Sequence, residues 1–149
     1  MRAMYSLTVV NPAEYIPHIG DLLARNWGET GFDFPFNPNI EAYQALYEAG
    51  MIFAIAAINT VGVAGYCTVS ITPHLHNPEI IVAANDALFV DKPHRRGTLG
   101  ARIIVAAEKE AKARGAGRFI WHCRAGTGLA KTLCKHGYDE VDNIVMKEM

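Results

Sequence analysis

The chain has 149 residues, of which 50% are hydrophobic and 19% are charged, and its formal net charge is −1. This size suits one globular domain over residues 1–149, and the composition excludes general disorder. The near-zero net charge argues against a protein that binds nucleic acid mainly through contacts to the phosphates. No apolar run reaches the length of a membrane span, no signal-peptide pattern opens the chain, and its three cysteines form no CxxC pair. We therefore expect a cytoplasmic protein with reduced thiols and no membrane contact.

The first third of the chain predicts one strand and two helices. Residues 5–10 are apolar and β-branched, as in a strand. Residues 13–26 repeat apolar side chains at helical spacing, with Pro17 in the first turn, where its missing amide hydrogen costs little. Residues 28–39 are rich in Gly, Phe, Pro and Asn and predict an ordered loop. A second helix is predicted over residues 40–49.

The middle of the chain predicts three consecutive strands. Residues 51–58, 61–72 and 80–90 are apolar and β-rich. The pair Asn59-Thr60 favours a hairpin between the first two strands. Residues 73–78 contain two prolines and two histidines, and they predict a turn-rich connection between the second and third strands.

The pattern changes after residue 90. Residues 97–114 predict an amphipathic helix, residues 118–124 a strand, residues 128–136 a short helix and residues 138–149 a final strand. An antiparallel meander that runs into a βαβ unit makes a mixed sheet with helices on its faces. The predicted class is therefore α+β.

The segment richest in chemical signals joins the last strand of the meander to the long helix. It ends an apolar strand, passes through a short basic turn and opens an amphipathic helix. Amide hydrogens at a helix N-terminus lack acceptors and carry partial positive charge. Gly97 and Gly100 leave the backbone bare, and Arg95 and Arg96 add full charges. These features predict a phosphate or pyrophosphate site, with an ordinary strand-to-helix turn as the alternative. The glycine spacing fits neither the P-loop nor the dinucleotide fingerprint.

These residues resemble the signature of the GNAT acyl-coenzyme A N-acyltransferases. Leu88-Phe89-Val90 ends the strand, and Arg95-Arg96-Gly97-Thr98-Leu99-Gly100 follows at the spacing of the family motif. Thr98 stands where the family carries its middle glycine, a variant similar to small phage and bacterial GNAT-like proteins. The closing Lys135-His136-Gly137-Tyr138 is also similar to the end of the family's last helix. The predicted element order fits the GNAT fold over essentially the whole chain.

The resemblance implies a cofactor, a reaction and the residues that bind. Acetyl-coenzyme A would lie with its pyrophosphate on the amides from Arg95 to Ala101, and with its pantetheine arm along the strand edge near Leu88 and Val90. This strand would splay from residues 118–124, and an amine would attack the acetyl group directly in a ternary complex. The implied cofactor-binding residues are Leu88, Phe89, Val90, Arg95, Arg96, Gly97, Thr98, Leu99, Gly100 and Ala101.

Catalysis of amine acetylation calls for a general base. Asp86 is the first candidate, because it precedes Leu88 on the same strand; a polar strand end or bulge is the alternative. His74 and His76 are the second candidates, since an i, i+2 pair on an extended segment shares one face, although histidines in a turn are commonly just exposed. This pair lacks an obvious third ligand, so no metal site is predicted.

The general acid and the acceptor are less defined. The family's proposed acid, a tyrosine of the last helix, corresponds to Leu133, which leaves water, Cys134 or another group for that role. Trp27, Phe32 and Phe34, with the neighbouring Phe36, either line the acceptor pocket or plug the core beneath their loop. The short C-terminal part implies an open acceptor side, which makes a homodimer a reasonable expectation.

Function is therefore predicted as acetyl transfer to an amine of a small molecule, peptide or protein. Besides a metal-dependent enzyme that would use His74 and His76, two alternatives come from other classes. One is a non-catalytic acyl-coenzyme A-binding module, favoured by Leu133. The other is a GNAT-like modifier of nucleic-acid bases, which the low net charge disfavours.

Overall fold

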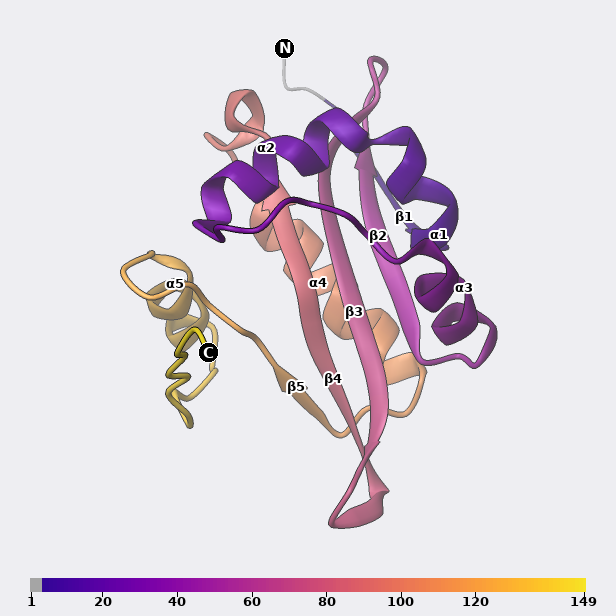
Figure 1. Cartoon of the computed structure of the whole chain (residues 1–149), viewed down its shortest axis with the longest axis vertical. Helices are drawn as coiled ribbons and strands as arrows, with labels where there is room; N and C mark the ends of the chain where they lie inside the picture. Colours follow the sequence, from indigo (N-terminus) through magenta and orange to yellow (C-terminus); the bar gives the residue numbers. More distant parts are fainter. Residues whose placement is uncertain (1–3) are drawn as a thin grey trace.

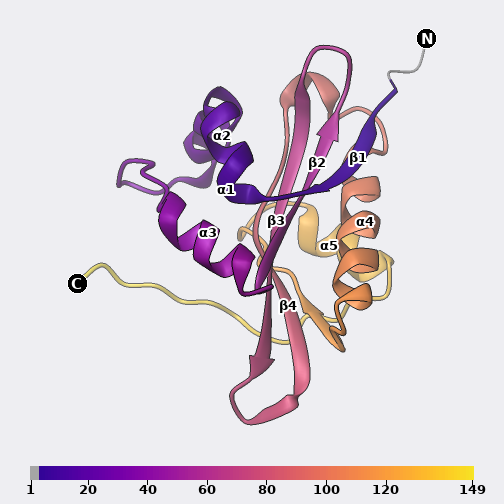
Figure 2. The same ribbon diagram turned by 90° about the vertical axis from the view of Figure 1, so that its right-hand side faces the viewer.

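The computed structural model describes residues 4–149. A five-stranded sheet, in the order β1-β2-β3-β4-β5, runs through the molecule, and helices cover both of its faces (Figures 1 and 2). The first three strand pairs are antiparallel, whereas β4 and β5 are parallel. The predicted α+β class, a mostly antiparallel sheet with one parallel βαβ unit, is confirmed.

The N-terminal helical region differs from the prediction. After β1 (Ser6–Val10) come α1 (Pro12–Tyr15), a 3-10 turn (Ile16–His18) and α2 (Gly20–Thr30). The single helix predicted over residues 13–26 is wrong, because Pro17 cannot continue the hydrogen bonding and its ring crowds the preceding turn. The prediction of a loop from residue 28 is also wrong at its start, since α2 runs on to Gly31, whose φ of 76° ends it. The helix α3 (Ile40–Glu48) lies where it was predicted.

The meander forms as predicted, and its last two strands extend further toward their shared turn. It consists of β2 (Ile52–Ile58), β3 (Val63–His74) and β4 (Asn77–Val90). The predicted connection over residues 73–78 is wrong in extent, because His74 pairs with Asn77 and only two residues make the turn. Its prolines fit at the tip of the hairpin, where the register is irregular and a missing amide hydrogen costs little.

The C-terminal part contains α4 (Leu99–Ala113), β5 (Arg118–Ile120) and α5 (Leu129–Lys135), each inside its predicted range. The predicted last strand is wrong: within the described chain, residues 139–149 belong to no helix or strand. An extended segment becomes a strand only when a neighbouring strand accepts its backbone hydrogen bonds, and β5 pairs over three residues with β4 alone. None of the helices that the structure describes is long and apolar enough to cross a membrane.

Two clusters of apolar side chains, one on each face of the sheet, form the core. Ile103 and other residues of α4 pack on one face, and Leu22 and Leu23 of α2 pack on the other. Gly65 of β3 lets α4 approach closely, because a Cβ there would lie 2.8 Å from Ile103 Cδ1. The start of α4 is thus held against the end of β4, which is where the predicted site lies.

Candidate functional site

The turn between β4 and α4 contains backbone amides that have no acceptor within the described chain. A short 3-10 turn (Lys92–His94) opens with Asp91, whose side chain accepts a hydrogen bond from the amide of Lys92. The amide of Arg95 donates to Lys92 O at 3.3 Å, and the first backbone bond into α4 is donated by Arg102 to Thr98 O. Across residues 4–149, no acceptor is found for the amides of residues 96–101. Six consecutive amides therefore remain available at the positive end of a fifteen-residue helix.

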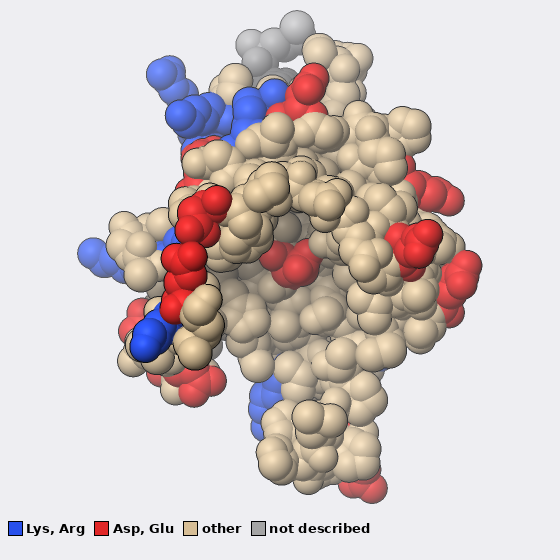
Figure 3. Space-filling view, viewed as in Figure 1, with Lys and Arg blue, Asp and Glu red and all other residues tan. Residues whose placement is uncertain are grey.

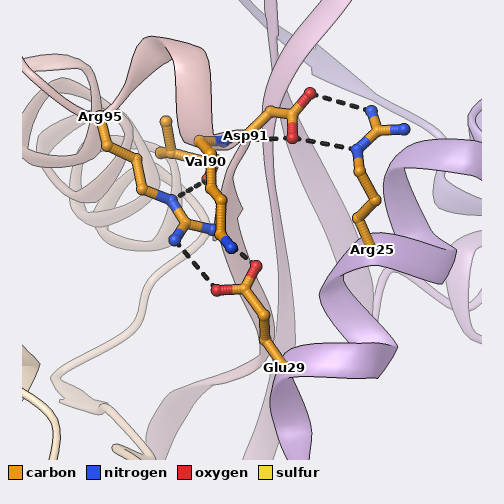
Figure 4. Close-up of polar contacts among 6 residues, drawn as sticks. Arg25, Glu29, Val90, Asp91 and Arg95 are labelled. Carbon is orange, nitrogen blue, oxygen red and sulfur yellow. Dashed lines mark hydrogen bonds and ion pairs between the residues drawn. The ribbon is translucent and has the colours of Figure 1, made fainter.

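The side chain of Arg95 is committed to the protein. Its Nε donates to Val90 O at 2.6 Å, and its two terminal nitrogens donate to the carboxylate of Glu29 at 3.0 and 2.8 Å (Figure 4). One helical turn earlier, Arg25 forms a similar bidentate pair with Asp91. These two ion pairs, which we call the α2 latch, join α2 to the turn after β4 and lower the pKa of both Glu29 and Asp91. Arg95 thus shapes the turn, and Arg96 supplies its exposed charge.

A gap opens between β4 and β5 just beyond their last pair. The two strands pair only from Val82 to Ala84 on β4, although β4 continues to Val90. Asn85 closes the paired part with its side chain, which accepts from His122 N at 2.6 Å and donates to His122 O at 3.3 Å. The predicted splay of these strands is present, and Figure 1 shows β5 diverging from β4 toward α5.

The backbone of the free part of β4 has a defined orientation. Asp91 N donates to Ala64 O on β3, and in an antiparallel pair the direction of the backbone groups alternates along the strand. The backbone groups of Leu88 and Val90 therefore face the gap. One of the acceptors there, Val90 O, already receives the hydrogen bond from Arg95. The remaining groups form a strand edge to which an extended ligand can add.

A cavity of about 400 Å³ lies beside this gap, between the sheet, α2 and the start of α5. Figure 3 shows it as a hollow with an acidic side chain at its floor, and Asp86 is the one acidic residue among its described lining. Thr68 pairs with Ala87 and Val69 pairs with Asn85, so Asp86 is the extra residue of a β-bulge. A bulge redirects a side chain out of the regular alternation. The predicted alternative of a bulge is therefore met by Asp86, and because the same residue lines the cavity, its role as a general base stays a prediction.

Two tyrosines lie with Asp86 in this cavity. Tyr43, on α3, donates its hydroxyl hydrogen to Asp86 Oδ2 at 2.6 Å. Burial, together with the negative charge of Asp86, raises the pKa of Tyr43 above its usual range, so its hydroxyl stays protonated. Tyr66, on β3, is 1% exposed and also lines the cavity. Asp86 is therefore held in place by one tyrosine and shares the cavity with a second.

The predicted aromatic residues gather at the mouth of the cavity. Trp27 stacks on Phe32 with ring centroids 5.0 Å apart, and both line the cavity together with Phe36. Phe34 supports them from behind, since it packs against Trp27 and accepts the indole hydrogen bond on its carbonyl oxygen. Phe32, Phe34 and Phe36 are all exposed by more than a third, so these rings form a wall and do not plug the core.

The histidine candidates lie elsewhere. His74 and His76 occupy the tip of the β3–β4 hairpin, where His74 Nδ1 accepts from the amide of His76. Neither lines the cavity that contains Asp86. Because both strands run further toward the hairpin tip than predicted, they carry this pair away from the gap (Figure 1). Among residues 4–149, no group of three His, Cys, Asp or Glu side chains is arranged to hold a metal ion.

The far wall of the gap is α5, which is anchored to α4. Tyr138, just after α5, donates its hydroxyl hydrogen to Glu108 of α4. Leu133, at the position of the family's tyrosine, is 4% exposed and packs inward, and Leu129 lines the cavity in its place. Cys134 is exposed and outside the lining. Cys123 lines the cavity, and burial raises the pKa of its thiol.

Sequence reasoning missed three residues that shape this site, and it predicted Asn85 only as part of a polar strand end or bulge with Asp86. Tyr43, Tyr66 and Asn85 meet Asp86 or its strand only through the helix packing and the sheet register, and Glu29 pairs with a residue 66 positions away. For Asn85 and Tyr66 a local signal exists, since a polar side chain within an apolar, buried strand needs a hydrogen-bond partner. For Glu29 and Tyr43 the sequence carries no such signal.

Comparisons with known proteins agree with this geometry. The model of the acetyltransferase (GNAT) family matches residues 17–138. An acetyltransferase from Trypanosoma brucei superposes with a TM-score of 0.75 at 15% identity, covering 98% of this chain and 100% of that one. A ribosomal-protein-alanine N-acetyltransferase from Brucella melitensis gives 0.72 at 13%, covering 98% and 99%.

The aminoglycoside N-acetyltransferase AAC(6')-Iy, in complex with a bisubstrate analogue that contains coenzyme A, gives a TM-score of 0.74 at 13% identity and covers 99% of each chain. A search of curated protein sequences finds no match. At such identities the solved structures establish the fold, and the family model, which spans most of the sequence, establishes the relationship. The protein belongs to the GNAT family of acetyltransferases.

Proposed function

We propose that this protein transfers an acetyl group from acetyl-coenzyme A to the nitrogen of an amine. The observation that carries the proposal is the meeting of two features at one end of β4. These are the row of amides over residues 96–101, which have no acceptor in the described chain, and the strand edge that faces the gap. A ligand with a diphosphate and an extended amide-bearing arm matches both.

The residues present fit coenzyme A. The amides of residues 96–101 suit a diphosphate, because a helix N-terminus attracts negative charge. Gly100 leaves room for the diphosphate. The space beside its Cα is open, since the nearest atom to a Cβ built there would be Val90 Cγ2 at 3.9 Å. The backbone groups of Leu88 and Val90 suit the pantetheine amides, and Arg96 adds positive charge. When bound, acetyl-coenzyme A supplies an activated acetyl thioester at the open end of the gap.

Asp86 is the proposed general base. Its carboxylate lines the cavity next to Ala87 and Leu88, so an amine in the cavity approaches both Asp86 and the strand edge. Tyr43 holds one carboxylate oxygen at 2.6 Å and leaves the other for the amine. Asp86 would take a proton from the nitrogen as the new bond forms. With Leu133 packed inward, the departing sulfur would take its proton from water.

The proposal predicts that Gly100→Glu abolishes binding of coenzyme A. The substitution suits the first turn of α4, where a carboxylate stabilises a helix, but its charge would lie on the amides that receive the diphosphate. Isothermal titration calorimetry should show a loss of affinity of at least about 100-fold, with an unchanged melting temperature. Ala113→Glu, at the exposed end of the same helix, makes the same change in net charge and should bind normally.

An assay of thiol release with a panel of amines separates an enzyme from the alternative of a non-catalytic binding module. Turnover with at least one amine supports the proposal. Binding of coenzyme A without turnover on any amine would favour the module, and normal binding by Gly100→Glu would remove the diphosphate site.

A further inference from the structure

The end of the chain has the composition of a strand but no neighbouring strand. Residues 139–149 are exposed throughout, and their backbone forms no hydrogen bond to another part of the described chain. Scattered apolar side chains are normal on a surface, whereas a contiguous apolar run indicates a contact site. Within residues 140–146, which we call the free segment, four apolar side chains are 74–94% exposed: Val141, Ile144, Val145 and Met146. Three of them are consecutive, so both faces of the extended segment are apolar, as in a strand that is covered on both sides.

The last strand of the sheet, β5, has an edge without a partner. Within the described chain it pairs with β4 alone. The amide of Gly117 donates to Ile81 O on β4, so by alternation the backbone groups of Arg118 and Ile120 point away from β4. Residues 118–124, which we call the β5 edge, alternate between exposed and half-buried side chains, as an extended strand does. An unpaired edge of this kind is a surface to which another strand can add.

The free segment and the β5 edge match in length, polarity and charge. Each spans seven residues, and each has an exposed isoleucine, Ile144 in the segment and Ile120 in the edge. The edge has an arginine at each end and the segment begins with acidic residues, and none of these charges is in an ion pair within residues 4–149. When the two isoleucines lie opposite each other, opposite charges also meet across the strands, which stabilises the pairing. The charged pairs are Glu140 with Arg124 in an antiparallel arrangement and Asp142 with Arg118 in a parallel one.

Within one copy the two features do not meet. Tyr138, just before the free segment, is tied to α4 through its hydroxyl bond to Glu108 and to α5 through its amide, which donates to Leu133 O. Figure 2 shows the chain leaving this anchor toward the side of the sheet that carries α1–α3, away from β5. Each copy therefore has both an unused strand and an unused edge. Two copies satisfy both at once by the same contact repeated about a two-fold axis.

We infer that the free segment of one copy pairs with the β5 edge of a second copy, and that two copies form a symmetric dimer by this exchange. The dimer would bury eight apolar side chains, four from each segment. At about 60–120 Å² each, together with the equal area that covers them, they give about 1,000–1,900 Å², and a specific interface needs about 1,000 Å². The contact uses none of the amides of residues 96–101, so the inference does not depend on the proposed acetyl transfer.

The first test is the mass of the protein in solution, measured by sedimentation equilibrium. The wild type should show twice the chain mass of 16.3 kDa. Ile144→Lys should weaken dimerisation by at least about 100-fold, because it places an ammonium group in an apolar contact. Val105→Lys makes the same charge change at an exposed apolar residue of α4 and should leave the dimer intact. A monomeric wild type, or a dimer that tolerates Ile144→Lys, would overturn the inference.

A mixing experiment separates exchange between copies from pairing within one copy. Ile120→Glu should also be monomeric, but an equimolar mixture with Ile144→Lys should form a heterodimer, because one contact keeps both isoleucines and the other pairs glutamate with lysine. Hydrogen exchange should show protected amides over residues 140–146 in the mixture and in neither variant alone. Protection of these amides in a monomer, or a mixture without heterodimer, would overturn the inference. Ile144 is exposed in the single copy, so the first test stands even if Ile120→Glu does not fold.

Discussion

Asp86 owes its place in the cavity to one extra residue in β4. Without the bulge, strand alternation would direct the side chain differently, and Tyr43 could not donate to it. We expect Asp86→Asn to lower kcat by about 100-fold or more, because the amide keeps the shape but cannot take a proton. The affinity for coenzyme A should stay within about twofold, since Asp86 lies away from the amides of residues 96–101. Thiol-release kinetics and calorimetry measure the two quantities.

Asp33→Asn is the matched control for this change, because Asp33 is exposed in the aromatic loop and is not part of the cavity lining. It should leave kcat unaltered. A variant at position 86 that retains full kcat would show that water, and not this carboxylate, receives the proton.

At the same scale, sequence reasoning found Asp86 but not its two tyrosines. Asp86 lies on the motif strand itself, two residues before Leu88, so its neighbourhood is local in sequence. The contact of Tyr43 with Asp86 spans 43 positions and depends on how α3 docks on the sheet. Tyr66 reaches the cavity because it pairs with Phe89, and a shift of one residue would turn it to the other face. His74 and His76 lie outside the cavity for a related reason: how far the two strands extend decides where the hairpin tip lies, and the local sequence does not fix that extent.

At the scale of elements, the α2 latch connects a helix to the functional turn, and its strength depends on pH. Arg95 lowers the pKa of Glu29 below its ordinary value of 4.5. A carboxylate whose pKa is lower in the folded state stabilises the protein above its ordinary pKa, and this contribution disappears as the pH falls through the folded-state pKa. Both partners are about 40% exposed, at 38% and 41%, so the pair contributes little.

We therefore expect Glu29→Gln to lower the melting temperature by about 1–2 °C at pH 7, and by nothing measurable near pH 2. Added salt at pH 7 should shrink the difference as well. Glu148→Gln, an exposed change in the C-terminal segment that involves none of the recorded ion pairs, should melt like the wild type. A difference that persists at pH 2 would mean that Glu29 acts through packing rather than through its charge.

The elements themselves were predictable where the pattern was long and regular. The fifteen-residue α4 and the fully apolar β2 carry period and composition signals that no neighbour overrides. The errors lie at prolines, at the end of α2 and at the C-terminal segment. Pro17 was placed inside a helix that it interrupts, and Pro73 and Pro78 were placed in a loop although the strands extend past them. The strand predicted over residues 138–149 would have required a neighbouring strand to pair with, and the local sequence does not show whether one is present.

At the scale of the whole molecule, charge is distributed unevenly although the net charge is only −1. Lys and Arg side chains gather at the end of the molecule that carries the turn after β4 (Figure 3). Two of the arginines there, Arg25 and Arg95, are neutralised by the α2 latch. Lys92 and Arg96 are exposed, and no ion pair to either occurs within the described chain. An anionic ligand approaching this end therefore meets a local positive field that the total charge does not reveal.

This distribution predicts that the affinity for coenzyme A depends on ionic strength. Raising NaCl from 50 to 500 mM should weaken binding by about tenfold, because the Debye length falls well below the distance over which these exposed charges act. Calorimetry on Arg96→Gln should show weaker binding at low salt and a smaller salt effect, since one screened charge has been removed. Lys147→Gln makes the same charge change in the exposed C-terminal segment and should leave the salt effect unaltered. If Arg96→Gln kept the full salt dependence, the screened charge would lie on another group, such as the exposed Lys92, and the arginine would have no part in attracting the diphosphate.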